Sequence, residues 1–140
     1  MTTYGTAKWQ GGLKDGKGAI STKSGALSDY PYGFASRFEG KPGTNPEELI
    51  GAAHSGCFTM ALSLILEQAG FKAEEMNTKA EITLTKQGDG FAITKSQLTL
   101  RAKIPGIDSA KFQELAGMAE KGCPVSKVLN CEIVLDAALV

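Results

Sequence analysis

Short strand-like runs and glycine-rich turns alternate through the first third of the chain. Pairs such as Gly11-Gly12 and Ser24-Gly25 separate these runs, which is typical of tight turns between neighbouring strands. The pattern predicts a β-meander of three strands, at residues 4–10, 17–23 and 34–39.

A long apolar segment follows, and both of its ends carry helix-boundary signals. Asn45 is a good N-cap, Pro46 suits the first helical position, and carboxylates occupy the first turn, where the helix dipole favours them. Gly70 supplies the stop. The segment therefore predicts a helix over residues 46–69.

The predicted helix is apolar around most of its circumference, so nearly every side of it must be covered. Its residues 49–66 carry no formal charge and approach the length of a membrane span, but they include His54 and several glycine, serine and threonine residues. We therefore interpret the segment as a buried helix and predict no membrane contact. Because a chain of this size has little material to cover it, we expect a second subunit to supply the rest.

Two strand patterns follow this helix. Apolar and polar residues alternate strictly over residues 76–85, which is typical of a half-buried strand. Gly88-Asp89-Gly90 then turns the chain back into a second strand over residues 91–104.

Two helices and a final strand complete the chain. Asp108 is the expected N-cap of a helix that ends at Gly122, and Cys123 followed by Pro124 opens a short helix. A strand over residues 131–135 comes last. The order βββαββααβ predicts an α+β fold in which antiparallel β-sheets pack around a long buried central helix, with residues 1–140 forming one domain.

Composition and charge favour one compact soluble domain. The chain has 140 residues, 42% of them hydrophobic, and 15 basic residues balance 15 acidic ones. A chain of this length buries about 68% of the surface that its unfolded form exposes, so it can form a core without metals or disulfides. Since there is no excess of positive charge, we expect no binding to nucleic acid or to an anionic membrane. Three cysteines, an odd and sparse number, and an N-terminus without a secretory signal favour a cytoplasmic protein.

The candidate chemistry lies among three cysteines and one histidine, because the sequence holds no phosphate-binding loop, nucleophile elbow or metalloprotease motif. Cys131 alternates with apolar residues of the last strand, so we interpret it as a small buried side chain. Cys123 occupies an N-cap ahead of a proline, where free backbone N–H groups lower the pKa of a thiol. Cys57 lies within the apolar helix and needs a cation beside it to become a nucleophile. Arg37 is the only arginine before that helix.

Three segments carry a family resemblance. They read PYGFASRFEG at 31–40, GTNPEELIGAAHSGCF at 43–58 and KGCPVS at 121–126. The combination of Asn-Pro-Glu-Glu-Leu, a cysteine ten residues after the first glutamate and a distal Gly-Cys-Pro is specific. In these features, and over nearly its whole length, the chain resembles the osmotically inducible protein C (OsmC) and organic hydroperoxide resistance family, and the OsmC branch in particular.

The resemblance implies a function and a site. In that family the first cysteine attacks the peroxide, the second resolves the product, and an arginine with a glutamate orients the reactive sulfur. These roles fall on Cys57, Cys123, Arg37 and Glu47. The resemblance also implies an intertwined homodimer with the long helices at its centre, no cofactor or metal, and a role in the stress response. Such a peroxidase reduces organic hydroperoxides, and hydrogen peroxide more weakly, at the expense of a dithiol of the lipoyl type.

The residue chemistry agrees with this mechanism. A Cys57 thiolate would release an alcohol or water from a peroxide and become a sulfenic acid, which Cys123 can condense to a disulfide. The fold must therefore hold together two sulfurs that are 66 residues apart (123 minus 57). Glu47 and Cys57 are about 15 Å apart along a straight helix and about 80° apart around it. Arg37 must then bridge them, and we expect the site at the dimer interface.

Other interpretations of the same residues stay open from the sequence. Glu48 replaces Glu47 if the helix starts one residue differently. A cysteine hydrolase would pair Cys57 with His54, although no orienting Asn or Asp is evident. A metal-binding or structural stress protein would use His54, Cys57 and Cys123 without peroxidase turnover, but a closed zinc site needs four ligands. Four apolar residues serve either as a wall that favours bulky hydroperoxides or as ordinary core: Phe34, Phe38, Phe58 and Met60.

Overall fold

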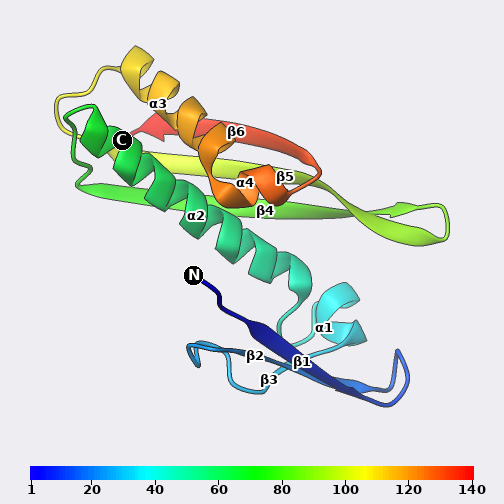
Figure 1. The fold of residues 1–140 in the computed structure, drawn as a ribbon. Helices are drawn as coiled ribbons and strands as arrows, with labels where there is room; N and C mark the ends of the chain where they lie inside the picture. The colour runs from blue at the N-terminus through cyan, green and yellow to red at the C-terminus, as the bar shows by residue number, and fades with distance from the viewer. The chain divides into compact units, whose positions relative to one another are not determined.

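The computed structural model describes residues 1–140 and divides into two compact units, residues 1–49 and residues 50–140. The first unit contains β1 (Gly5–Gln10), β2 (Lys17–Thr22), β3 (Tyr30–Tyr32) and α1 (Phe34–Phe38). The long helix α2 (Pro46–Gln68) begins at the end of the first unit and continues into the second. The second unit also contains β4 (Glu75–Gln87), β5 (Gly90–Lys103), α3 (Ser109–Gly122), α4 (Pro124–Val128) and β6 (Glu132–Leu139), all labelled in Figure 1. This is the predicted order of elements with one short helix, α1, added.

The first unit is an antiparallel meander in the order β1-β2-β3, as the turn pattern predicts. The strand predicted over residues 34–39 is wrong, because this segment forms α1 and the third strand is β3. Phe34 and Phe38 share one side in a strand and in a helix alike, since a spacing of four residues fits both periods. Ser36 favours the helix, because its hydroxyl accepts a hydrogen bond from the Gly33 N–H at 2.9 Å.

The second unit is built on a sheet in the order β4-β5-β6. β4 and β5 form a long antiparallel hairpin, whereas β6 runs parallel to β5. The prediction of purely antiparallel sheets is therefore wrong for this last pair. The reason is the connection through α3 and α4, since a long helical crossover brings the chain back to run in the same direction. α2 and α3 cover the same face of the sheet (Figure 1).

The core of the second unit lies between the sheet and these two helices. Phe58, Leu62 and Leu66 form one stripe along α2, and none of them is more than 1% exposed. They pack with apolar residues of β5 and α3. Gly51 lies on the same stripe, and a Cβ there would come within 2.9 Å of the Ala80 carbonyl oxygen. A larger residue at position 51 would therefore force α2 away from β4.

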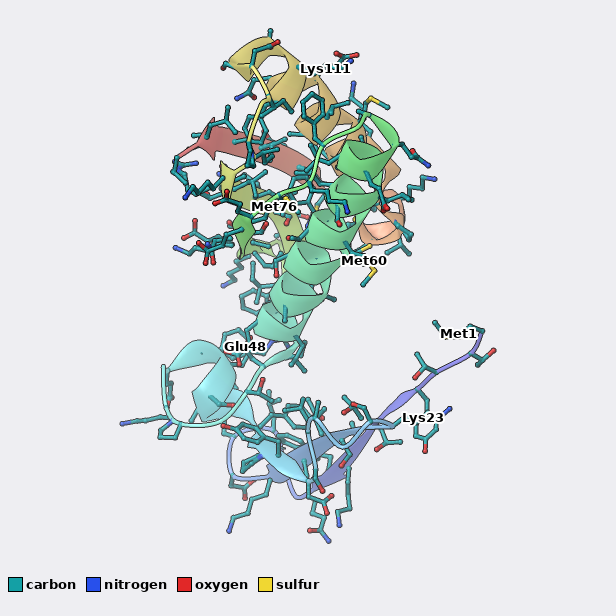
Figure 2. The ribbon with its side chains drawn as sticks, turned by 90° about the vertical axis from the view of Figure 1, so that its left-hand side faces the viewer. Met1, Lys23, Glu48, Met60, Met76 and Lys111 are labelled. Carbon is teal, nitrogen blue, oxygen red and sulfur yellow. The ribbon has the colours of Figure 1, made fainter.

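The opposite face of α2, called the open face below, is not covered by the rest of the second unit. Met60 is 76% exposed and Leu64 is 55% exposed. Met60, labelled in Figure 2, borders an open cleft of about 910 Å³ that is lined by α2 and by residues 71–78. By length and composition alone α2 could cross a membrane, but its buried stripe makes it the long central helix of a soluble α+β fold. The predicted α+β fold class is thus confirmed.

Candidate active site

Two of the predicted site residues, Cys57 and Cys123, meet in the second unit. Cys57 lies on α2 and is half-buried, while Cys123 lies at the start of α4 and is fully buried. Each side chain acts on the pKa of the other, so the two lie side by side, and both are free thiols. Cys131 is also free and lies just before β6. The fold therefore brings together the two sulfurs that the predicted disulfide requires.

The start of α4 favours the ionised form of Cys123. Cys123 is the N-cap of this helix, Pro124 occupies its first turn, and the Ser126 N–H donates to Cys123 Sγ at 3.3 Å. Burial raises the pKa of the Cys123 thiol, but hydrogen bonds from the side chain and backbone of Ser126, from Cys57 and from the Val125 backbone outweigh it. The pKa of Cys123 therefore lies below its ordinary value, as expected for a thiol at a helix N-terminus.

The influences on the pKa of Cys57 have the opposite net effect. Burial raises the pKa of the Cys57 thiol, and the neighbouring Cys123 adds to this rise, while a hydrogen bond with the Val125 backbone lowers it only in part. No cation is among these influences. Residues 50–140 alone thus make Cys123 the more acidic thiol of the pair, and Cys57 becomes a good nucleophile only if a positive charge is added beside it.

The other two predicted site residues, Arg37 and Glu47, form an ion pair within the first unit. Arg37 on α1 donates from Nε to both carboxylate oxygens of Glu47, at 3.0 and 3.2 Å, and from Nη2 to Oε1 at 2.5 Å. Glu47 is buried in the first turn of α2, whereas Arg37 is partly exposed. Glu48 instead accepts a hydrogen bond from the Thr44 hydroxyl at 2.9 Å. The partner of Arg37 is therefore Glu47, and the alternative with Glu48 in its place is wrong.

Local sequence signals explain why Glu47 is held in this position. The Asn45 side chain accepts a hydrogen bond from the Glu48 N–H at 2.8 Å, which caps the start of α2 as predicted. Pro46 then fixes the first helical residue. This start places the Glu47 carboxylate in the first turn, where both the helix dipole and the arginine stabilise its charge.

His54 belongs to a buried network that the sequence does not predict. It is fully buried on α2, and its ring lies 2.6 Å (Nδ1) from Ser96 Oγ on β5 and 2.8 Å (Nε2) from Ser126 Oγ on α4. Burial lowers the pKa of His54, which favours the neutral ring. Because both ring nitrogens bond to serines, the hydrolase interpretation, in which His54 activates Cys57, is wrong. No group of three or more His, Cys, Asp or Glu side chains is placed to hold a metal ion.

The four residues considered for an apolar wall do not all have the same surroundings. Phe58 is a fully buried core residue, and Met60 is largely exposed on the open face of α2. Phe34 and Phe38 pack on each other in the first unit, with ring centroids 5.0 Å apart. Core packing is therefore the role of Phe58.

Comparison with known proteins gives consistent results. Residues 38–137 match the family model described as OsmC-like protein. The chain is 54% identical over 135 residues to the peroxiredoxin OsmC of Escherichia coli (strain K12), covering 96% of this chain and 94% of the relative. It is also similar to the organic hydroperoxide resistance protein OhrB of Bacillus subtilis, at 32% identity over 122 residues, 85% of this chain and 88% of the relative. The crystal structure of that OhrB superposes with a TM-score of 0.76 at 28% identity, covering 99% of this chain and 98% of that one.

Proposed function

This chain belongs to the OsmC-like protein family, and from that membership together with its thiol pair we infer that it is a thiol-dependent peroxidase that reduces organic hydroperoxides to alcohols. The observation that carries the inference is that the Cys57 and Cys123 side chains are neighbours, each of which acts on the pKa of the other. Two neighbouring thiols, one half-buried and one fully buried, can be oxidised to a disulfide and reduced again. The enzyme needs no metal or other cofactor for this chemistry.

The proposed cycle has three steps. The Cys57 thiolate attacks the terminal peroxide oxygen, the O–O bond breaks, and the leaving alkoxide takes a proton to become an alcohol. The resulting Cys57 sulfenic acid is attacked by the Cys123 thiolate, so that a disulfide forms and hydroxide leaves as water after taking a proton. A dithiol reductant of the lipoyl type then supplies two electrons and two protons and restores both thiols.

Arg37 is the proposed activating cation for the first step. Burial raises the pKa of Cys57 and no cation is among the influences on it, so the proposed cycle needs a positive charge that stabilises the thiolate. Arg37 uses Nε and Nη2 to hold Glu47, which leaves Nη1 to donate to a thiolate. A guanidinium suits this double task because its donors form a rigid planar fork. We place this arrangement at the interface of a homodimer.

The dimer and the single domain are parts of the same proposal. The open face of α2, with Met60 and Leu64 exposed, is the surface that a second subunit would cover. The family match over residues 38–137 runs through both compact units, which supports one OsmC-like domain. Three free cysteines and a cycle that depends on dithiol reduction fit a reducing compartment, so we assign the protein to the cytoplasm.

Steady-state turnover tests the proposed function directly. We expect consumption of an alkyl hydroperoxide with dihydrolipoamide as reductant, slower consumption of hydrogen peroxide, and little turnover with glutathione.

Iodoacetamide labelling distinguishes a peroxidase from a metal-binding stress protein. A peroxidatic Cys57 labels at neutral pH and is protected by stoichiometric cumene hydroperoxide, whereas a metal site would be protected by zinc. Protection by zinc without any peroxide turnover would contradict the proposal.

The charge of Arg37 gives a second measurable expectation. Burial raises the pKa of Cys57, and the positive charge of a partly desolvated arginine beside the sulfur would act in the opposite direction, because it stabilises the thiolate. A lysine at position 37 cannot bind Glu47 and the Cys57 thiolate at the same time as a planar guanidinium can. In Arg37→Lys we therefore expect the pH of half-maximal Cys57 alkylation to rise by about one unit. Peroxide reduction at neutral pH should slow about tenfold. Glu47→Gln should act in the same direction but more weakly.

The matched control for Arg37→Lys is Arg101→Lys. Arg101 pairs with Asp136 on the second sheet at 3.3 Å and is the only other arginine of the chain. The Arg101→Lys variant should have the same pH profile of Cys57 alkylation as the parent protein. If the profile of folded Arg37→Lys overlays that of the parent, Arg37 is not the activating cation.

A further inference from the structure

His54 is a buried titratable group that the proposed cycle does not use. Both of its ring nitrogens are held, by Ser96 Oγ at 2.6 Å and by Ser126 Oγ at 2.8 Å. A neutral imidazole has one N–H donor and one bare nitrogen that accepts. The two serines must therefore play opposite parts, one as donor to the ring and one as acceptor from it.

Ser126 connects His54 to the sulfur of Cys123. Its backbone N–H donates to Cys123 Sγ at 3.3 Å, and its side chain is among the groups that lower the pKa of the same thiol. A serine hydroxyl has a single hydrogen, which goes either to the ring of His54 or to the sulfur. If His54 Nε2 carries the proton and donates to Ser126 Oγ, the hydroxyl hydrogen of Ser126 is left for Cys123 Sγ. Nδ1 then accepts from the Ser96 hydroxyl, which satisfies every polar atom of the network.

We propose that His54 is a positioning residue for Cys123, acting through Ser126: Nε2–H occupies the Ser126 oxygen and so directs the Ser126 hydroxyl hydrogen onto the Cys123 sulfur. This rests on the proposed function, in which Cys123 attacks the Cys57 sulfenic acid. In that step the Cys123 thiolate gives the electron pair of the new S–S bond, and the sulfenic oxygen leaves as hydroxide and takes a proton to become water. Two donors from Ser126 stabilise the thiolate before the attack.

The surroundings of these groups suit a neutral histidine. Burial is the cause that shifts the pKa of His54, and it lowers it. The titratable group that acts on Cys123 is Cys57, and no charged side chain contributes at either His54 or Cys123. The histidine therefore orients a hydroxyl without placing a net charge in the core, where an unpaired charge would be costly.

The pKa of Cys123 tests the inference in a background where it is the only thiol, Cys57→Ser with Cys131→Ser. It is measured by the pH dependence of thiolate ultraviolet absorbance, which does not require a reagent to reach the buried sulfur. We expect Ser126→Ala, which keeps the backbone donor, to raise the pKa of Cys123 by about one unit, the value of one hydrogen bond to a charged group. The control Ser55→Ala removes a hydroxyl that bonds only to its own helix, and it should cause no shift.

Two variants of His54 separate positioning from packing. His54→Leu should raise the pKa of Cys123 as Ser126→Ala does, whereas His54→Gln, whose amide donates from near the position of Nε2, should restore most of the parent value. A pKa of Cys123 that is the same in the Ser126→Ala and Ser55→Ala proteins would overturn the inference. So would a pKa that responds to Ser126→Ala but not to His54→Leu.

Kinetics in the protein with all three thiols distinguish this inference from the proposed function. Ser126→Ala should slow formation of the Cys57–Cys123 disulfide about tenfold, since fewer Cys123 sulfurs are ionised, while the first peroxide step stays within about twofold of the parent. A parent protein without peroxide turnover would reject the proposed function and leave the Cys123 pKa comparison valid. A parent that turns over normally, with an unchanged disulfide rate in Ser126→Ala, would reject the inference alone.

Discussion

Replacing Cys57 by serine is expected to abolish hydroperoxide consumption by the folded protein. Serine is nearly isosteric, but its hydroxyl is not ionised near neutral pH and cannot be oxidised to a sulfenic acid. The loss should be complete, at the level of the uncatalysed reaction, both in steady state and in the first turnover. Rapid-mixing measurement of peroxide consumption with the reduced protein checks this result.

Cys123→Ser is expected to behave differently from Cys57→Ser. The first turnover should proceed, because Cys57 still meets the peroxide, and the protein should then stop as a Cys57 sulfenic acid that over-oxidises with excess peroxide. Dimedone trapping and mass spectrometry identify that product. Cys131→Ser is the matched control, since Cys131 lies outside the thiol pair, and it should retain nearly all turnover.

These two variants decide which thiol of the pair attacks the peroxide, a question that the pKa shifts of the two thiols raise. Within residues 50–140 hydrogen bonding lowers the pKa of Cys123, while burial raises that of Cys57. If Cys123 were the attacking thiol, Cys57→Ser would keep its first turnover and Cys123→Ser would lose it. That reversed outcome would contradict the assignment of Cys57 and remove the need for Arg37 as an activating cation.

Local signals predict most of the elements because caps and turns depend on neighbouring residues. Asn45 and Asp108 cap their helices with side-chain hydrogen bonds to the N–H three residues on, and Cys123 does the same through sulfur. The direction of β6 is not a local property, since it depends on how a long helical connection returns to the sheet. The strand predicted over residues 34–39 is wrong because the apolar spacing of this segment fits a strand and a helix equally.

The candidate site, like the fold, is predicted from the sequence only in part. The thiol pair and the Arg37–Glu47 pair are implied by the family resemblance. The network around His54 does not, because its two partners lie 42 and 72 residues away in the sequence and serine is a common surface residue. The one local hint is the position of Ser126, three residues after the N-cap Cys123, where its N–H meets the capping atom. Only the fold brings Ser96 to the other side of the ring.

The open face of α2 gives the second prediction with a large effect. The parent protein should sediment as a dimer of its 14.7-kDa chain at micromolar concentration, because a soluble protein seldom leaves such an apolar helix face uncovered. The double variant Met60→Asp with Leu64→Asp should sediment as a monomer. Two carboxylates without partners in a buried interface would cost several kcal/mol, which weakens association by at least about a hundredfold.

The dimer prediction also tests where the site is built. If Arg37 reaches Cys57 across the interface, the double variant should lose peroxidase turnover together with its dimer, and the pKa of Cys57 should rise to the burial-dominated value of the single chain. Met118→Asp makes the same kind of change at a residue of α3 that is 51% exposed, and it should alter neither property. A stable parent monomer would contradict the dimer. A monomeric double variant with full turnover would show that Arg37 and Cys57 of one chain suffice, because the activating charge would then not depend on a partner.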